Sequence, residues 1–141
     1  MKRSVRILAL LLATVLLCGI LVSCVPLIDS VKVESALLEA GYTVSFAGDD
    51  IIGAYMSEGI DLDEKIIATL SFYDTATKKR SEQYVAIYYF ADIKTAKKAM
   101  ERVTADASAE KTEKYVDWIE PTRFGNVVYY GTESAVEIAK K

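Results

Sequence analysis

Two stretches decide the fold of this chain: KIIATLSFY at residues 65–73 and EQYVAIYYF at residues 82–90. In the first stretch, apolar Ile66, Ala68 and Leu70 alternate with other residues, which is the two-residue period of a β-strand. The second stretch is rich in tyrosine and β-branched residues, which are favoured in strands. The residues between them, 74–81, are polar and basic. We therefore predict that the two stretches pair as a hairpin.

Outward from this hairpin, the chain alternates helices with strands. Apolar residues at helical spacing predict a helix over 30–40, and alternation predicts a strand over 42–46. Residues 51–64, which contain two glycines, fit a short helix or an irregular loop. A second helix is expected to begin after Asp92 and to fade in 105–113.

The C-terminal part predicts a second hairpin, with strands at 115–119 and 124–130 and a turn at 120–122, followed by a helix from 131 onward. The expected order is α-β-ββα-ββα. Hairpins that alternate with helices favour an α+β domain in which a mostly antiparallel sheet carries its helices on one face, in two layers.

Composition excludes several classes of function. The chain has 141 residues, 17 basic and 20 acidic side chains and a net charge of −3, which gives no basis for binding nucleic acid. It contains no histidine, so imidazole metal ligands and nucleophiles activated by histidine are excluded. The acidic residues of 49–64 do not match the spacing of an EF-hand loop, so we expect no metal and no cofactor.

The N-terminus has the design of an export signal. Lys2, Arg3 and Arg6 precede an uncharged apolar run over 7–22, and Ser23 and Cys24 follow. The end of this segment, Leu21-Val22-Ser23-Cys24, resembles the lipobox of bacterial lipoprotein precursors. The resemblance covers the first 24 residues and implies that the chain is cut between Ser23 and Cys24. It also implies that a diacylglycerol is attached to the Cys24 sulfur.

On this interpretation residues 1–23 are a signal peptide, 24–29 a short lipidated tether and 30–141 one domain. The mature chain has 118 residues and a net charge of −6, and after lipidation it contains no free thiol. It would be held by its lipid on the extracytoplasmic side of the cell membrane. Two alternatives stay open: a plain secretory signal with an ordinary thiol at Cys24, or an uncut apolar segment over 7–28 that spans the bilayer.

No catalytic motif stands out in the domain. It lacks a Gly-x-Ser-x-Gly elbow and the clustered glycines of a phosphate-binding loop. We therefore expect a non-catalytic binding or accessory module whose protein or small-molecule partner is unknown. The alternative from another class is an exported enzyme that uses carboxylates alone, which would need two acids close together in a pocket.

Two groups of residues are candidates for contact with other molecules. Tyr84, Tyr88, Tyr129 and Tyr130 lie on expected strands and could form an outward aromatic row for a ligand, although tyrosine is also common in ordinary strands. Lys78, Lys79 and Arg80 fall at the expected tip of the first hairpin. They could orient the domain on an anionic membrane, or they could simply be a solvated turn.

Overall fold

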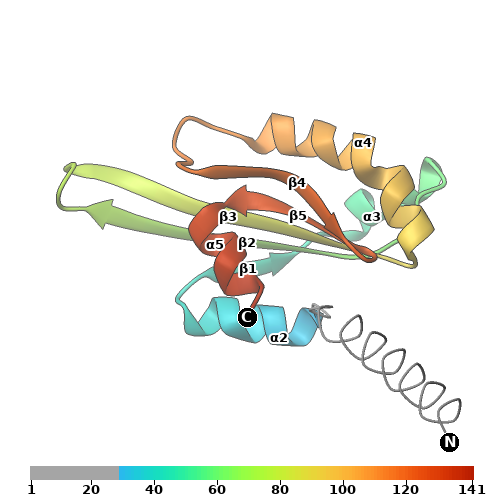
Figure 1. The fold of residues 1–141 in the computed structure, drawn as a ribbon, viewed down its shortest axis with the longest axis horizontal. Helices are drawn as coiled ribbons and strands as arrows, with labels where there is room; N and C mark the ends of the chain where they lie inside the picture. Colours follow the sequence, from blue (N-terminus) through green and yellow to red (C-terminus); the bar gives the residue numbers. More distant parts are fainter. Residues whose placement is uncertain (1–28) are drawn as a thin grey trace, which may run out of the picture.

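The computed structural model describes residues 29–141, and these form a five-stranded sheet with four helices (Figure 1). All neighbouring strands are antiparallel, in the order β1-β2-β3-β5-β4. The α+β class and the antiparallel sheet are as predicted. The elements are α2 (Ser30–Glu39), β1 (Thr43–Phe46), α3 (Asp49–Ser57), β2 (Leu62–Asp74), β3 (Lys79–Phe90), α4 (Ile93–Glu110), β4 (Trp118–Phe124), β5 (Val127–Thr132) and α5 (Glu133–Ala139).

The predicted first hairpin is the longest feature of the sheet. β2 and β3 pair from Leu62↔Phe90 to Asp74↔Lys79, with an irregularity near Asp63. Their neighbours are shorter, because β1 pairs only with residues 66–69 of β2 and β5 only with residues 85–89 of β3. The outer part of the hairpin, residues 70–83, therefore projects from the body as a two-stranded arm (Figure 1).

Helices cover both faces of the sheet, which corrects the expectation of a single covered face. On one face α4 packs its small residues, including Ala99 and Val103, over side chains of β3 and β5. On the other face α2 and α5 pack Leu37 and Val136 over Ile66 and further residues of β2, β3 and β5. The two cores make β3 a buried strand from residue 84 to residue 90.

The helix on the first face is longer than the sequence predicted. α4 does not fade after residue 104 but continues to Glu110, and Ala107 in its last turns is fully buried. The segment 51–64, which fitted a helix or a loop, begins inside a helix: α3 covers Asp49–Ser57, and its Tyr55 enters the same core.

The second hairpin has a different turn from the one predicted. β4 runs through 120–122, and the chain reverses at Gly125 and Asn126 before β5. β4 is an edge strand, and its pairing with β5 shifts between Ile119 and Thr122, around Pro121. An edge strand and an irregular register tolerate proline, because no ladder hydrogen bond from its nitrogen is required there. Gly125 has a positive φ of 59°, which suits a tight two-residue turn.

Candidate functional site

A network of tyrosines and carboxylates joins α4 to the sheet. Tyr84 and Tyr88 on β3, Tyr130 on β5 and Tyr55 on α3 all point their hydroxyls toward the C-terminal half of α4. These four side chains are between 0 and 6% exposed. Neighbouring rings lie 5.8–6.3 Å apart, as expected for packed aromatic pairs.

Two carboxylates of α4 accept the hydrogen bonds from these tyrosines. Asp106 Oδ2 accepts from Tyr55 at 2.6 Å and from Tyr88 at 3.1 Å. Glu110 Oε2 accepts from Tyr130 at 2.6 Å and from Tyr84. The hydroxyl oxygens of Tyr88 and Tyr130 lie 3.0 Å apart, so the two acids and their donors form one continuous cluster, which we call the tyrosine network.

Cations balance both acids. Lys65 is only 3% exposed, and its Nζ lies 3.0 Å from Glu110 Oε1 and 4.6 Å from the centre of the Tyr88 ring. Arg102 Nε donates to Asp106 Oδ1 at 3.2 Å, and Arg102 Nη1 reaches Glu58 Oε1 at 2.5 Å. A buried ammonium without a partner would be costly, so the position of Lys65 depends on Glu110.

The electrostatics of the network favour a structural role. Burial raises the pKa of Tyr55, Tyr84, Tyr88 and Tyr130 well above the ordinary value of 10.0, and the nearby carboxylates of Asp106 and Glu110 raise it further. These hydroxyls therefore stay protonated and act as hydrogen-bond donors. The hydroxyls, carboxylates and cations are paired with one another.

The tyrosines expected to form an outward row are thus placed differently. Tyr84, Tyr88 and Tyr130 are buried beneath α4 and line no open face. Tyr129 points to the opposite face, where it packs beside the second core with Lys140 Nζ 5.5 Å from its ring centre. The prediction of an exposed aromatic row is wrong because both sheet faces carry helices.

Asp106, Glu110 and Lys65 are functional candidates of the structure that the sequence did not predict. A signal for the acids was present, because Ala99, Val103, Asp106 and Glu110 continue one helical stripe at intervals of three and four residues. Carboxylates on such a stripe normally mark the point where the buried face of a helix ends. Here they face the sheet because the tyrosines opposite them donate hydrogen bonds.

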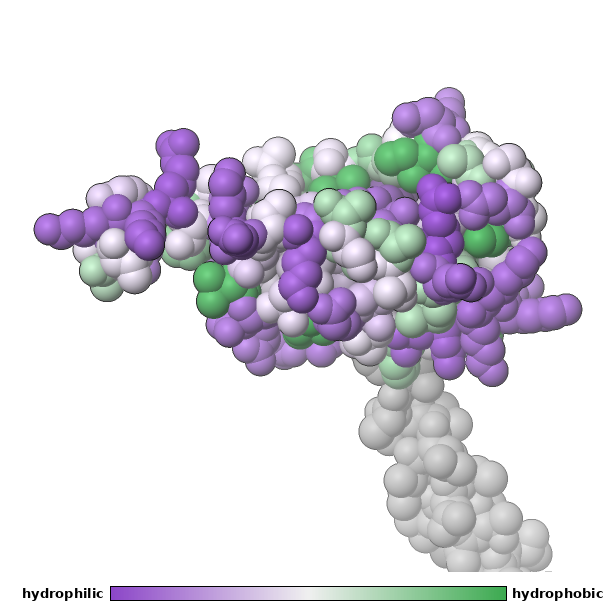
Figure 2. Space-filling view, turned by 90° about the horizontal axis from the view of Figure 1, so that it is seen from above, coloured by the Kyte–Doolittle hydropathy of each residue, from purple (hydrophilic) through white to green (hydrophobic). Residues whose placement is uncertain are grey.

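The basic tip lies where it was expected. Lys78, Lys79 and Arg80 are exposed at the end of the arm, beside a turn in which Asp74 accepts hydrogen bonds from Ala76 and Thr77. Seen from the α4 side, the surface is largely hydrophilic, with separated apolar patches (Figure 2). Along the arm, Phe72 and Tyr73 are 40% and 61% exposed.

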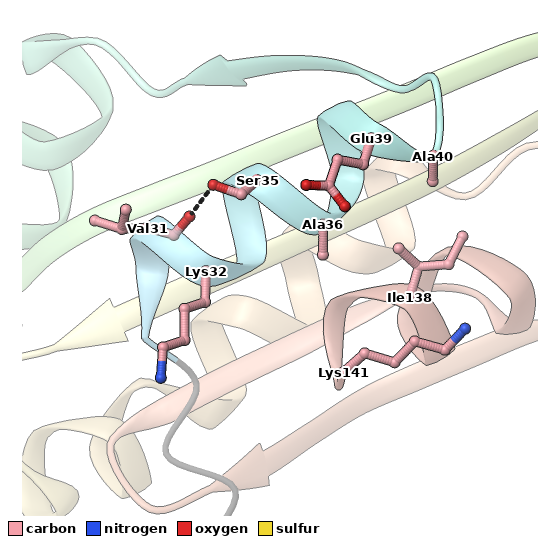
Figure 3. Close-up of a pocket in the computed structure, with 8 residues that line it drawn as sticks. All are labelled: Val31, Lys32, Ser35, Ala36, Glu39, Ala40, Ile138 and Lys141. Atoms are coloured by element: carbon pink, nitrogen blue, oxygen red, sulfur yellow. Dashed lines mark hydrogen bonds between the residues drawn. The ribbon is translucent and has the colours of Figure 1, made fainter.

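Elsewhere on the surface of residues 29–141, two of the hollows are large enough to describe. One, of about 250 Å³, lies at the base of the arm between Phe72, Glu82 and Val116. The other is a shallow groove of about 680 Å³ between α2 and α5 (Figure 3). Val31, Lys32 and Ser35 line its α2 side, and Ile138 and Lys141 line its α5 side.

Comparison with known proteins assigns no family. No family model, no curated protein and no solved structure matches the chain. Over residues 29–141 there is no helix long and apolar enough to cross a bilayer, and no cluster of three acidic or sulfur ligands that could hold a metal ion. Ser23 and Cys24, the residues of the lipobox, lie outside the described residues.

Proposed function

We propose that this protein is a lipoprotein of the bacterial cell envelope, anchored through Cys24 on the extracytoplasmic side and acting as a non-catalytic binding or accessory module. The observation that carries the proposal is the sequence of 1–24, in which a basic start, an apolar run and Leu21-Val22-Ser23-Cys24 follow one another. The first described helix begins at Ser30, six residues after Cys24, which leaves a short tether between lipid and domain.

The absence of cysteine after position 24 also supports export with a lipid anchor. The chain has two cysteines, at positions 18 and 24, and the first would be removed with the signal. The domain therefore needs no disulfide and can fold in an oxidising compartment without mispairing. Two apolar cores and the tyrosine network supply its stability.

The way the buried ionisable groups are used supports the non-catalytic part of the proposal. A carboxylate-only enzyme would require two acids poised for proton transfer, and Asp106 and Glu110 lie one turn apart on α4. They instead accept hydrogen bonds from four tyrosines and form ion pairs with Arg102 and Lys65. Such an arrangement stabilises the helix on the sheet.

The anchor is tested by expressing the full chain and two cysteine variants in a bacterium that is fed an alkyne-tagged fatty acid. The wild type should incorporate the label and remain with the membrane fraction after a salt wash. Cys24→Ala should lose the label and accumulate as an uncut precursor. Cys18→Ala is the matched control and should behave as the wild type. Equal labelling and processing of the two variants would overturn the lipid anchor.

A further inference from the structure

The outer face of α2 carries an apolar ridge that no other residue of 29–141 covers. Val31 and Leu38 are 66% and 52% exposed, and Ser35 lies between them on the same side of the helix. These positions are spaced four and three residues apart, so they share one line along the helix. Val33 and Leu37, on the opposite side, are buried against the sheet. The ridge is therefore not part of the domain core.

The position of the proposed anchor limits what can lie against this ridge. The Cα atoms of Cys24 and Asp29 are separated by five peptide units, which span at most about 17 Å when fully extended. The residues between them include Val25, Leu27 and Ile28, which are apolar and carry no charge. A lipid on Cys24 thus keeps the first turn of α2 close to the bilayer surface.

We propose that the outer face of α2, with the ridge of Val31 and Leu38 at its centre, rests on the lipid headgroups of the membrane that holds the anchor. This inference rests on the proposed function. The groove toward α5 opens beside the ridge, and Lys32 and Lys141 are among the residues that line it (Figure 3).

Charge on this face favours an apolar contact over an electrostatic one. The positive charges of Lys32 and Lys141 are offset by the negative charges of Glu34 and Glu39 on α2. The surface is close to neutral, so it needs no anionic lipid. The arm tip, with its three cations, lies well away from the start of α2 along the long axis of the molecule (Figure 1). A domain resting on α2 holds α2 near the bilayer and the arm tip away from it, whereas a domain oriented by the basic tip brings the tip to the bilayer.

The orientation is tested on the lipidated full chain in phosphatidylcholine vesicles, with and without phosphatidylglycerol. Because lipidation of Cys24 and removal of Cys18 leave no free thiol, Ser35→Cys and Thr77→Cys each provide one labelling site. An environment-sensitive fluorophore is attached, and a headgroup-level quencher lipid is added. We expect about twofold or stronger quenching at position 35 in both lipid mixtures and little at position 77, because contact with the interface is needed for quenching.

Ridge variants link the quenching to the apolar residues. Replacing Val31 and Leu38 together by serine should markedly reduce quenching at position 35 while leaving the chain anchored. Val116→Ser, at an exposed valine outside α2, should leave the quenching unchanged. Both changes are at exposed positions, so folding should be retained, which circular dichroism checks.

The outcomes distinguish a failure of the inference from a failure of the proposed function. If mass spectrometry shows a lipid on Cys24 but position 35 is not quenched, or position 77 is quenched more strongly, the inference is overturned and the anchor stands. If Cys24 carries no lipid, the proposed function fails, and the inference fails with it.

Discussion

Replacing Glu110 by alanine should loosen α4 from the sheet. The change removes the ion pair with Lys65 and the acceptor of Tyr84 and Tyr130. Loss of one partner of a buried ion pair costs about 3–5 kcal/mol. Glu110 is 30% exposed, so water partly replaces it, and the lower end of this range, about 3 kcal/mol, is expected. For a domain of this size the loss corresponds to a fall in Tm of about 10 °C.

Thermal and urea unfolding, followed by circular dichroism, measure the effect. The matched control is Glu101→Ala, which removes the same charge from an exposed site on the same helix and should change stability by less than about 0.5 kcal/mol. In the double variant Lys65→Met and Glu110→Gln, no ammonium is left without its carboxylate, so much of the loss should be recovered. Equal melting temperatures for Glu110→Ala and Glu101→Ala would refute the structural role of the network.

Two further predictions concern backbone space and pH. A Cβ at Gly131, where φ is +146°, would lie 2.1 Å from the Tyr84 carbonyl oxygen, so Gly131→Ala should destabilise by about 3 kcal/mol or more. Gly53→Ala, on an exposed helical site with open space, should instead stabilise by about 0.5–1 kcal/mol, and urea midpoints that move together would contradict this contrast. Folding raises the pKa of each buried tyrosine. Its contribution to the free energy of unfolding is therefore complete below pH 10. Above pH 10 this contribution falls by up to about 1.4 kcal/mol per pH unit for each tyrosine. Tyrosinate absorbance from these residues should therefore appear together with unfolding above pH 10, and their titration in a folded protein would contradict the buried network.

The first hairpin was predictable because its signal is local. Alternation in 65–73 and the apolar composition of 82–90 are sufficient to predict two strands, and the basic residues between them predict the turn. The covering of both sheet faces was missed, although residues 84–90 form an unbroken apolar run. Such a run is typical of a strand that is buried on both sides. Assigning helices to faces depends on packing between distant elements, which periodicity does not report.

The buried network could not be predicted from spacing alone. Asp106 and Glu110 face the core only because Tyr55, Tyr88 and Tyr130 supply hydroxyls from three different elements. The second turn was misplaced for a simpler reason. Proline is common in turns, which favours a turn at 120–122, but Pro121 lies on an edge strand with a shifted register. Gly125 with Asn126 forms the reversal.

The mass of the mature protein tests the central claim most directly. Intact-mass and peptide mass spectrometry of the protein purified from bacterial membranes should find a chain that starts at Cys24 and carries a diacylglycerol on the sulfur. A chain that retains residues 1–23, or one that begins elsewhere with an unmodified Cys24, would contradict the account.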